Sequence, residues 1–418
     1  MNIPIENIGS AKDNAKSAIH NWYKFTAGFS YKLVDLVVDE MGENPSAIFE
    51  PFAGCGTTLV AAQKREIPSF GNESQQLMCD IINAKLNWDI DNCCSQEYIE
   101  DINGYVAKNV ISDKVLAESH ELLKSLYDKE TLKVLYLIRD AIRQINDEKY
   151  RLFFNLALSQ TLHKSALHPI AVPYIVRSKN IVNSGDAWGK FSTIVKQMLA
   201  DLETMPHHQR YATVYKADSR KMNSQIGENL CDLCITSPPY LNNLDYGEVS
   251  KVHTHFFELT KDWHDITELI RKELVTGATT HYRDCDFDLN KFKASEFAIA
   301  NKELMKELEP RYMYLQKYSG ERKGRKSFHI LMMHYFEDMY YVLKEMRRIL
   351  KPNSRAYLIL GDSAPYGAYI PTTQFLGDIA MSVGFSEYRI DKIRSRGHKW
   401  KIKTRHNVDL SENILTLF

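Results

Sequence analysis

The feature that most restricts the fold of this chain is a strand, a glycine turn, a helix and a second strand, joined by very short connections. The segment runs from Pro45 to Glu73 and reads PSAIFEPFAGCGTTLVAAQKREIPSFGNE. Two strands that are connected through a helix in this way lie parallel in one sheet. The segment therefore predicts a βαβ unit and an α/β fold built on a parallel sheet.

The rest of the chain alternates between sheet-like and helical stretches. Residues 1–75 carry an N-terminal segment and the first half of the sheet domain, and residues 76–209 space apolar residues three and four apart, which predicts a large helical insertion. Strands return within 210–249. Residues 250–328 are mixed and polar and indicate a second insertion. Residues 329–418 contain a long amphipathic helix that KPN should stop, then strands, and the last two strands are expected to pair antiparallel.

The composition is that of an ordinary globular protein. Of 418 residues, 44% are hydrophobic and 25% are charged, and no apolar run is long enough to cross a bilayer. The N-terminal MNIPIENIGS lacks the basic and apolar regions of a signal peptide, so we expect a cytoplasmic protein. The net charge is zero, with 53 basic and 53 acidic residues, so local patches have to contact any polyanionic partner.

The cysteines indicate neither disulfides nor a metal. There are seven, an odd number at irregular spacing, which argues against a disulfide framework. Cys231 and Cys234 have the spacing of a zinc pair, but they fall in a predicted strand, where residues three apart face opposite sides. No second pair accompanies them, so we expect no metal site.

A glycine turn and an acid suggest a cofactor that carries a nucleoside. Gly54 and Gly56 stand between a strand and a helix, where backbone amides can approach a ligand, and Thr57 and Thr58 suit the helix start. The lysine of a phosphate-binding P-loop is missing, so triphosphate binding is not expected. Glu73 ends the next strand, where an acid can accept both hydroxyls of a ribose. Taken alone, the glycine turn could be just a tight strand-to-helix connection. Taken alone, Glu73 could be an acid that interacts with the dipole at a helix N-terminus.

A second motif, SPPY, follows the strand DLCIT. Pro238 and Pro239 fix their φ angles and lack N–H groups, so the chain is stiff and its carbonyls have set directions. Ser237 adds a hydroxyl, and Tyr240 offers a flat face on which a planar ring can stack. These residues describe a pocket for an aromatic amine, whereas a plain turn with two prolines would need neither the serine nor the tyrosine.

The two motifs together resemble the amino-group DNA methyltransferases, which use S-adenosylmethionine to methylate the exocyclic amine of cytosine or adenine. PFAGCGTT is similar to their cofactor loop, and TSPPY is similar to their catalytic tetrapeptide. IHNWYKFTAGFSYKLVDLV and YYVLKEMRRILKPNSRAYLILGDS are similar to segments that flank these motifs. The resemblance implies a Rossmann-like class I methyltransferase fold with a mostly parallel seven-stranded sheet, interrupted here by the two insertions.

The resemblance also implies roles for individual residues. Glu50 stands where the family commonly has an aspartate one methylene shorter, Glu73 would bind the ribose hydroxyls, and Asp218 would contact the adenine ring. The residues expected around the methionine part of the cofactor are Phe25, Phe52, Gly54, Gly56, Thr57 and Thr58. The catalytic loop would consist of Ser237, Pro238, Pro239 and Tyr240.

An aromatic amine is a weak nucleophile because its lone pair is delocalised into the ring, so the loop must mainly orient it. Ser237 Oγ and the Pro238 carbonyl can accept the two N–H groups. A base in duplex DNA has to be flipped out to reach such a pocket, and stacking on Tyr240 would offset part of the cost. Methylation of a ring carbon would need a nucleophilic cysteine, which the ring-carbon methyltransferases place after a proline, and the sequence has no Pro-Cys dipeptide. The basic residues expected at the DNA backbone are Arg322, Lys323, Arg325, Lys326, Arg394, Arg396 and Lys399.

Serine at the first position of the tetrapeptide resembles the cytosine-directed members, so the 4-amino group of cytosine is the expected target. The implied partners are double-stranded DNA and a cognate restriction endonuclease, and the insertions are the natural places for reading the DNA sequence. Three alternatives remain open: an adenine-directed enzyme, a methyltransferase acting on RNA or on a protein amide, and a catalytically silent DNA-binding protein.

Overall fold

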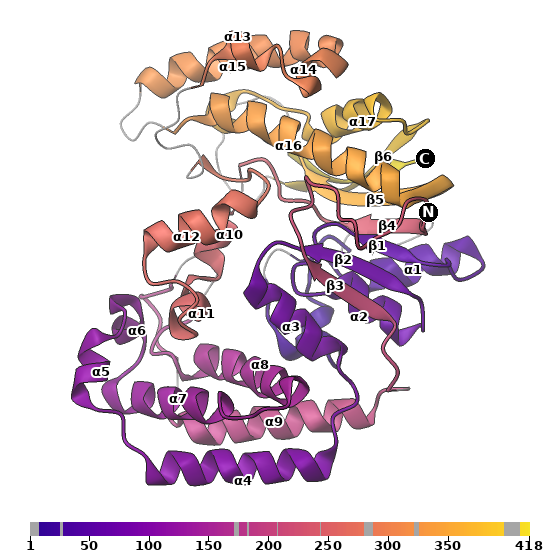
Figure 1. Cartoon of the computed structure of the whole chain (residues 1–418). Helices are drawn as coiled ribbons and strands as arrows, with labels where there is room; N and C mark the ends of the chain where they lie inside the picture. Colours follow the sequence, from indigo (N-terminus) through magenta and orange to yellow (C-terminus); the bar gives the residue numbers. More distant parts are fainter. Residues whose placement is uncertain are drawn as a thin grey trace.

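The computed structural model describes residues 8–25, 28–170, 175–181, 184–206, 208–242, 244–279, 287–321, 326–396 and 410–418. Within them the centre of the molecule is a seven-stranded sheet with the order β3-β2-β1-β4-β5-β7-β6 (Figure 1). The strands are β1 (Ile48–Glu50), β2 (Ser69–Glu73), β3 (Ala212–Lys216), β4 (Cys231–Thr236), β5 (Leu350–Gly361), β6 (Tyr388–Arg396) and β7 (Leu410–Leu417).

The first five strands pair parallel, and β7 runs antiparallel between β5 and β6. This arrangement confirms the predicted α/β fold with a mostly parallel sheet and the predicted pairing of the two terminal strands. The strand order is consistent with the Rossmann-like fold that the resemblance implied.

Helices cover both faces of the sheet, because successive residues of each strand point to opposite sides. On β4, Leu233 and Ile235 pack with α1 (Lys32–Met41) and α2 (Thr57–Lys64) in one core. Cys234 faces the opposite core, which is built mainly from α15 (Lys302–Glu321), α16 (Phe328–Ile349) and α17 (Thr372–Ser382). Strands buried on both faces explain the near-continuous apolar runs of β4 and β5.

The described residues of 76–203 form a helical lobe beside β3, and its core also takes in side chains of the N-terminal segment and α2 (Figure 1). Its helices are α3 (Gln76–Leu86), α4 (Asn92–Lys108), α5 (Asp113–Glu118), α6 (Glu121–Leu126), α7 (Lys129–Ile142), α8 (Glu148–Ser165) and α9 (Ala187–Glu203). Side chains cap several N-termini, as where Asp128 accepts from the amide of Thr131 at 2.8 Å. The lobe therefore has both the local signals and the apolar faces of stable helices.

The second insertion was expected to be mixed, and its described residues are mainly helical. α10 (Tyr246–Val249) precedes it, and it contains α11 (Lys251–Phe256), α12 (Trp263–Leu269), the 3-10 turn η4 (Arg271–Glu273), α13 (Leu289–Phe292), α14 (Glu296–Ala300) and α15. Short 3-10 turns also occur near the N-terminus as η2 (Asn14–Lys16) and η3 (His20–Trp22), and after β5 as η6 (Pro365–Gly367). None of the helices in the described ranges combines the length and apolarity that a membrane span needs.

The junction between α16 and β5 differs from the expectation. The KPN sequence was expected to separate helix from strand, but β5 begins at Leu350, directly after the helix. Asn353 adopts a left-handed φ of 63°, which asparagine tolerates better than most residues. Residues 351–354, which include KPN, form a bulge within β5, where the register with β4 shifts between Cys231 and Leu233.

Two glycines offer a matched test of packing in this fold. A Cβ on Gly71, in β2, would lie 2.8 Å from Leu59 Cδ1 and 3.1 Å from Ala53 Cβ. Gly71→Ala should therefore lower the free energy of unfolding by about 1–3 kcal/mol through overpacking. Gly104→Ala, on α4, meets no atom within 4 Å and should stabilise the protein by about 0.5–1 kcal/mol. Urea unfolding midpoints measure both, and equal midpoints for the two variants would contradict the packing of β2 on α2.

Candidate active site

The glycine turn and the SPPY loop emerge side by side from the sheet. β1 leads into the turn and β4 leads into the loop, and these two strands are parallel neighbours. The strand order reverses between them, which creates a crevice at their carboxyl ends where ligands of such sheets bind. A pocket lies at this point, lined by residues that follow both strands.

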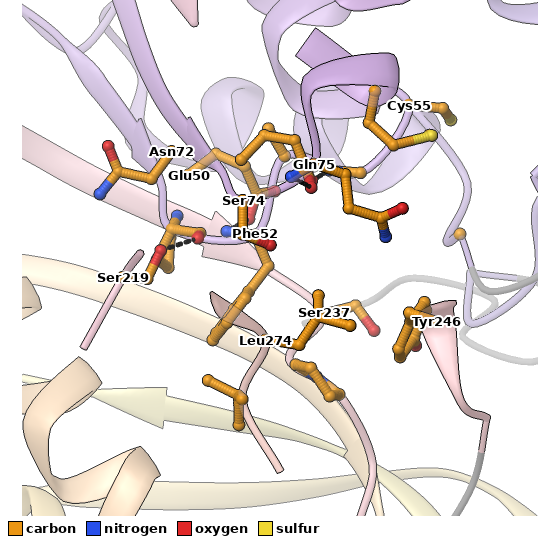
Figure 2. Close-up of a pocket in the computed structure, with 18 of the residues that line it drawn as sticks. Glu50, Phe52, Cys55, Asn72, Ser74, Gln75, Ser219, Ser237, Tyr246 and Leu274 are labelled. Atoms are coloured by element: carbon orange, nitrogen blue, oxygen red, sulfur yellow. Dashed lines mark hydrogen bonds between the residues drawn. The ribbon is translucent and has the colours of Figure 1, made fainter. Parts of the chain in front are cut away.

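Figure 2 shows that the pocket is lined from both sides of this crevice. Eight of the residues singled out from the sequence line it, namely Phe25, Glu50, Phe52, Gly54, Thr57, Glu73, Ser237 and Pro239. Glu50, Phe52, Cys55 and Gln75 come from the β1–β2 side, whereas Ser237 follows β4, Tyr246 begins α10 and Leu274 belongs to the second insertion. The structure thus brings the two motifs to one cavity.

The glycine turn needs residues without a Cβ. Gly54 and Gly56 have φ angles of 54° and 82°, in the left-handed region that favours glycine. The Gly54 amide donates to Glu73 Oε2 at 2.9 Å, and the Gln75 amide donates to Glu73 Oε1 at 2.8 Å. Glu73 therefore braces the turn while each of its oxygens keeps a lone pair for a ligand.

Two buried acids lie in this pocket. Burial raises the pKa of Glu73 to about 7, although the amide hydrogen bonds from Gln75 and Gly54 counteract it. Burial also raises the pKa of Glu50 to about 8, against the hydrogen bonds from Thr58 and from the Phe52 amide. The Thr58 hydroxyl lies 2.8 Å from Glu50 Oε2. Two buried carboxyls in one cavity make it a favourable site for a cationic ligand.

The SPPY loop presents an acceptor to the cavity. Ser237 Oγ donates to the Ile359 carbonyl at 3.1 Å, so its proton points to β5 and its lone pairs remain for a donor in the pocket. Pro239 also lines the pocket, and both prolines are buried. Because prolines have no N–H to satisfy, this stiff segment can be buried beside the cavity without unpaired donors.

Aromatic rings form one wall. Phe25 lies against Gly54, where an added Cβ would come within 3.2 Å of its ring. Its ring stacks on Tyr246 with centroids 6.4 Å apart and planes 24° apart. With Phe52, these rings give the polar groups of the pocket an apolar surround.

The second insertion closes the cavity through a segment that we call the roof, Glu273 to Val275. Arg271, just before it, forms an ion pair with Asp245 in which Nη2 and Oδ2 are 2.7 Å apart and the side chains are 8% and 5% exposed. Just after it, the Thr276 amide donates to Asp338 Oδ2 at 2.9 Å. Removing one partner of a buried ion pair is strongly destabilising, so the roof is firmly attached.

The remaining candidates of the two motifs lie just outside the cavity. Thr58 supports Glu50 from α2, and Gly56 packs on α3. Pro238 is buried, and Tyr240 is half-buried with its hydroxyl hydrogen-bonded to Glu412 on β7. Asp218 follows β3, and its carboxylate is held by Arg220 through two contacts of 2.9 Å, while its neighbour Ser219 lines the pocket.

The basic candidates are only partly within the described residues. Arg322, Lys323, Arg325 and Lys399 lie outside them, as does the side chain of Arg396. Lys326 has its ammonium 6.0 Å from the Phe328 ring centroid. Arg394 Nε lies 2.5 Å from Glu412 Oε2, so its charge is paired within the protein.

Sequence reasoning did not identify Tyr246, Gln75, Ser219 or the roof as lining residues. Tyr246 follows the SPPY loop closely, and that proximity was a usable signal. The roof is far from both motifs in sequence and carries no pattern of its own. In the described residues, no group of three or more His, Cys, Asp or Glu side chains could hold a metal ion.

Comparisons with known proteins agree with the fold. No protein-family model matches the chain. The chain is 22% identical over 429 residues to the type II methyltransferase M.BsoBI of Geobacillus stearothermophilus, covering 93% of this chain and 82% of that protein. It is 18% identical over 413 residues to the type II methyltransferase M.MvaI of Kocuria varians, covering 93% and 85%. This distant similarity over most of the chain supports the methyltransferase family.

The raised pKa of Glu50 makes stability depend on pH. Its folded pKa of about 8 exceeds the ordinary value of 4.5, so the folded state binds the proton more tightly. The free energy of unfolding should therefore fall as the pH rises from about 4.5 to 8, at up to about 1.4 kcal/mol per pH unit from one group. Glu50→Gln should flatten this decline, measured by urea unfolding across that range. Glu97→Gln, an exposed site on α4, is the control, and equal slopes in both variants would contradict the assignment.

Proposed function

We propose that the protein transfers the methyl group of S-adenosylmethionine to the exocyclic 4-amino group of cytosine in duplex DNA. It would act at a specific site, as the modification enzyme of a restriction–modification system. The observation that carries the proposal is that Ser237 and Pro239 of the SPPY loop line the same cavity as Gly54 and Glu73. The distant type II methyltransferases support the reaction class.

The residues of the cavity fit this cofactor. When bound, S-adenosylmethionine supplies an electrophilic methyl group on a positively charged sulfur. Glu73 would accept the ribose hydroxyls, and Glu50 offers a second buried acid for the positive charge. Phe25, Phe52 and the glycine turn would surround the methionine part. Asp218 remains a candidate contact for the adenine ring of the cofactor, because its neighbour Ser219 lines the pocket. Its carboxylate is already hydrogen-bonded to Arg220.

The loop would act by orienting the amine. Ser237 Oγ uses its own proton on Ile359, so toward the pocket it can only accept a hydrogen bond. With the Pro238 carbonyl it would fix both N–H groups of the target amine and leave the nitrogen lone pair directed into the cavity. Fixed acceptors of this kind act mainly through orientation and preorganised electrostatics.

The target base has to leave the duplex to reach this loop, and Tyr240 is the proposed stacking surface. The basic stretches within 317–327 and 389–406 are the proposed contacts to the DNA backbone. The helical lobe and the second insertion are the proposed readers of sequence; α11 and α12 lie beside the lobe, and α13 to α15 lie across the sheet from it (Figure 1). Cytosine is preferred over adenine because the tetrapeptide begins with serine, a tendency of the resembling family.

Labelled S-adenosylmethionine and unmodified DNA test the proposal directly. After incubation and digestion to nucleosides, the label should appear in 4-methylcytosine. Label in 6-methyladenine would move the target to adenine. Label in RNA in a parallel reaction, with none in DNA, would exclude DNA as the substrate. Cofactor binding without transfer to any nucleic acid would favour a silent DNA-binding protein.

Ser237→Ala should lower kcat by about 100-fold or more, since it removes a preorganised acceptor. The dissociation constant of the cofactor should change less than about 3-fold, because Ser237 contacts the amine and not the cofactor anchors. Ser382→Ala, on α17, is the matched control, since its hydroxyl also donates to a backbone carbonyl, that of Ile379. Full activity of the Ser237 variant would refute the role of the loop.

A further inference from the structure

The last residue of the SPPY loop is held from a remote strand. Tyr240 Oη donates to Glu412 Oε1 at 2.9 Å, across 172 residues of sequence. Glu412 lies on β7 and is 4% exposed, and it pairs in register with Gly361 at the end of β5. The phenol therefore reaches a carboxylate that the sheet itself places beside the loop.

A second contact fixes that carboxylate. Arg394 lies opposite Glu412 in the β6–β7 register, and its Nε is 2.5 Å from Glu412 Oε2. Arg394 Nη2 also donates to the carbonyl of Gly9 at 3.2 Å. At Gly9 an added Cβ would come within 2.6 Å of Glu412 Oε2, so the N-terminal segment packs directly on the pair. Glu412 Oε1 thus accepts the hydrogen bond of the phenol, and Oε2 makes the ion-pair contact with Arg394 without a hydrogen bond of good geometry.

We propose that Glu412 is a positioning residue that fixes the ring of Tyr240, with Arg394 neutralising the buried carboxylate. This inference rests on the proposed function, in which that ring is the surface beneath the extruded base. The prolines restrain Tyr240 through the backbone, and Glu412 restrains it through the hydroxyl, so the ring is ordered before the base arrives. Ordering a group in advance removes that entropic cost from the reaction.

The proposal changes the expected role of Arg394. Its side chain is 41% exposed, as a DNA contact would require, but its charge faces a carboxylate that is 5% exposed. A guanidinium committed to a buried carboxylate is less available to a phosphate than an unpaired one. Arg394 would therefore act through Tyr240, and its loss would alter the rate of transfer more than the salt dependence of DNA binding.

A double-mutant cycle tests whether Glu412 acts through Tyr240. Tyr240→Phe and Glu412→Ala should each lower kcat by roughly 10-fold, the effect expected for losing a hydrogen bond to a charged acceptor, and leave cofactor affinity unchanged. The double variant should be no slower than either single one. Glu412→Gln, which keeps an acceptor for the phenol, should retain more activity than Glu412→Ala. Losses that multiply in the double variant, or full activity of Glu412→Ala, would overturn the proposal.

A spectroscopic measurement separates this proposal from the proposed function. In protein labelled with 3-fluorotyrosine, the Tyr240 resonance is assigned by its loss in Tyr240→Phe. It should shift or broaden in Glu412→Ala and stay unchanged in Asp391→Asn, which breaks the exposed Arg389 pair on β6. An unchanged resonance in Glu412→Ala would overturn the proposal. If the wild-type protein methylates no DNA but the Tyr240 resonance still shifts in Glu412→Ala, the positioning role of Glu412 is supported and the proposed function is refuted.

Discussion

The structure depends on the parallel pairing of β1 with β4. Ile48 lies opposite Leu233 and Phe49 opposite Cys234, so the strands end together at the same edge of the sheet. Since the chain order reverses between these strands, their connections leave toward opposite faces and a crevice opens between them. The glycine turn and the SPPY loop meet because of this pairing, although about 180 residues separate them along the chain. A shift in the β1–β4 register would move the glycine turn away from the SPPY loop, and the two motifs would no longer line one cavity.

The carboxyl edge of a parallel sheet is open, and here the second insertion covers it. Leu274 and Val275 line the cavity, and the roof is held at one end by the buried Arg271–Asp245 ion pair and at the other by the hydrogen bond from Thr276 to Asp338. Arg220 links this attachment to the sheet, since its guanidinium contacts Asp218 after β3, Asp338 on α16 and the Lys272 carbonyl. The insertion is therefore part of the pocket as well as a proposed reader of DNA.

Local signals predicted the features that depend on neighbouring residues. The βαβ unit, the glycine turn and the acid that ends β2 all lie within Pro45–Glu73, and that short segment carries the periodicity and the turn residues that define them. The Tyr240 to Glu412 contact could not be predicted in this way, because only the sheet register brings those residues together. The charge of Arg394 was read as a patch for DNA. A count of basic residues cannot distinguish a solvated side chain from one paired to a buried acid.

The two acids of the cavity bear on turnover as well as on binding. A buried carboxyl with a raised pKa is poorly solvated, so a positive charge placed nearby gains more from it than the same charge would in water. In the proposed reaction the methyl donor carries such a charge and the demethylated product does not. Glu50 and Glu73 would therefore favour the donor over the product, and their preference would disappear at the moment of transfer. The same burial that makes the folded protein less stable at high pH would thus help to release the product.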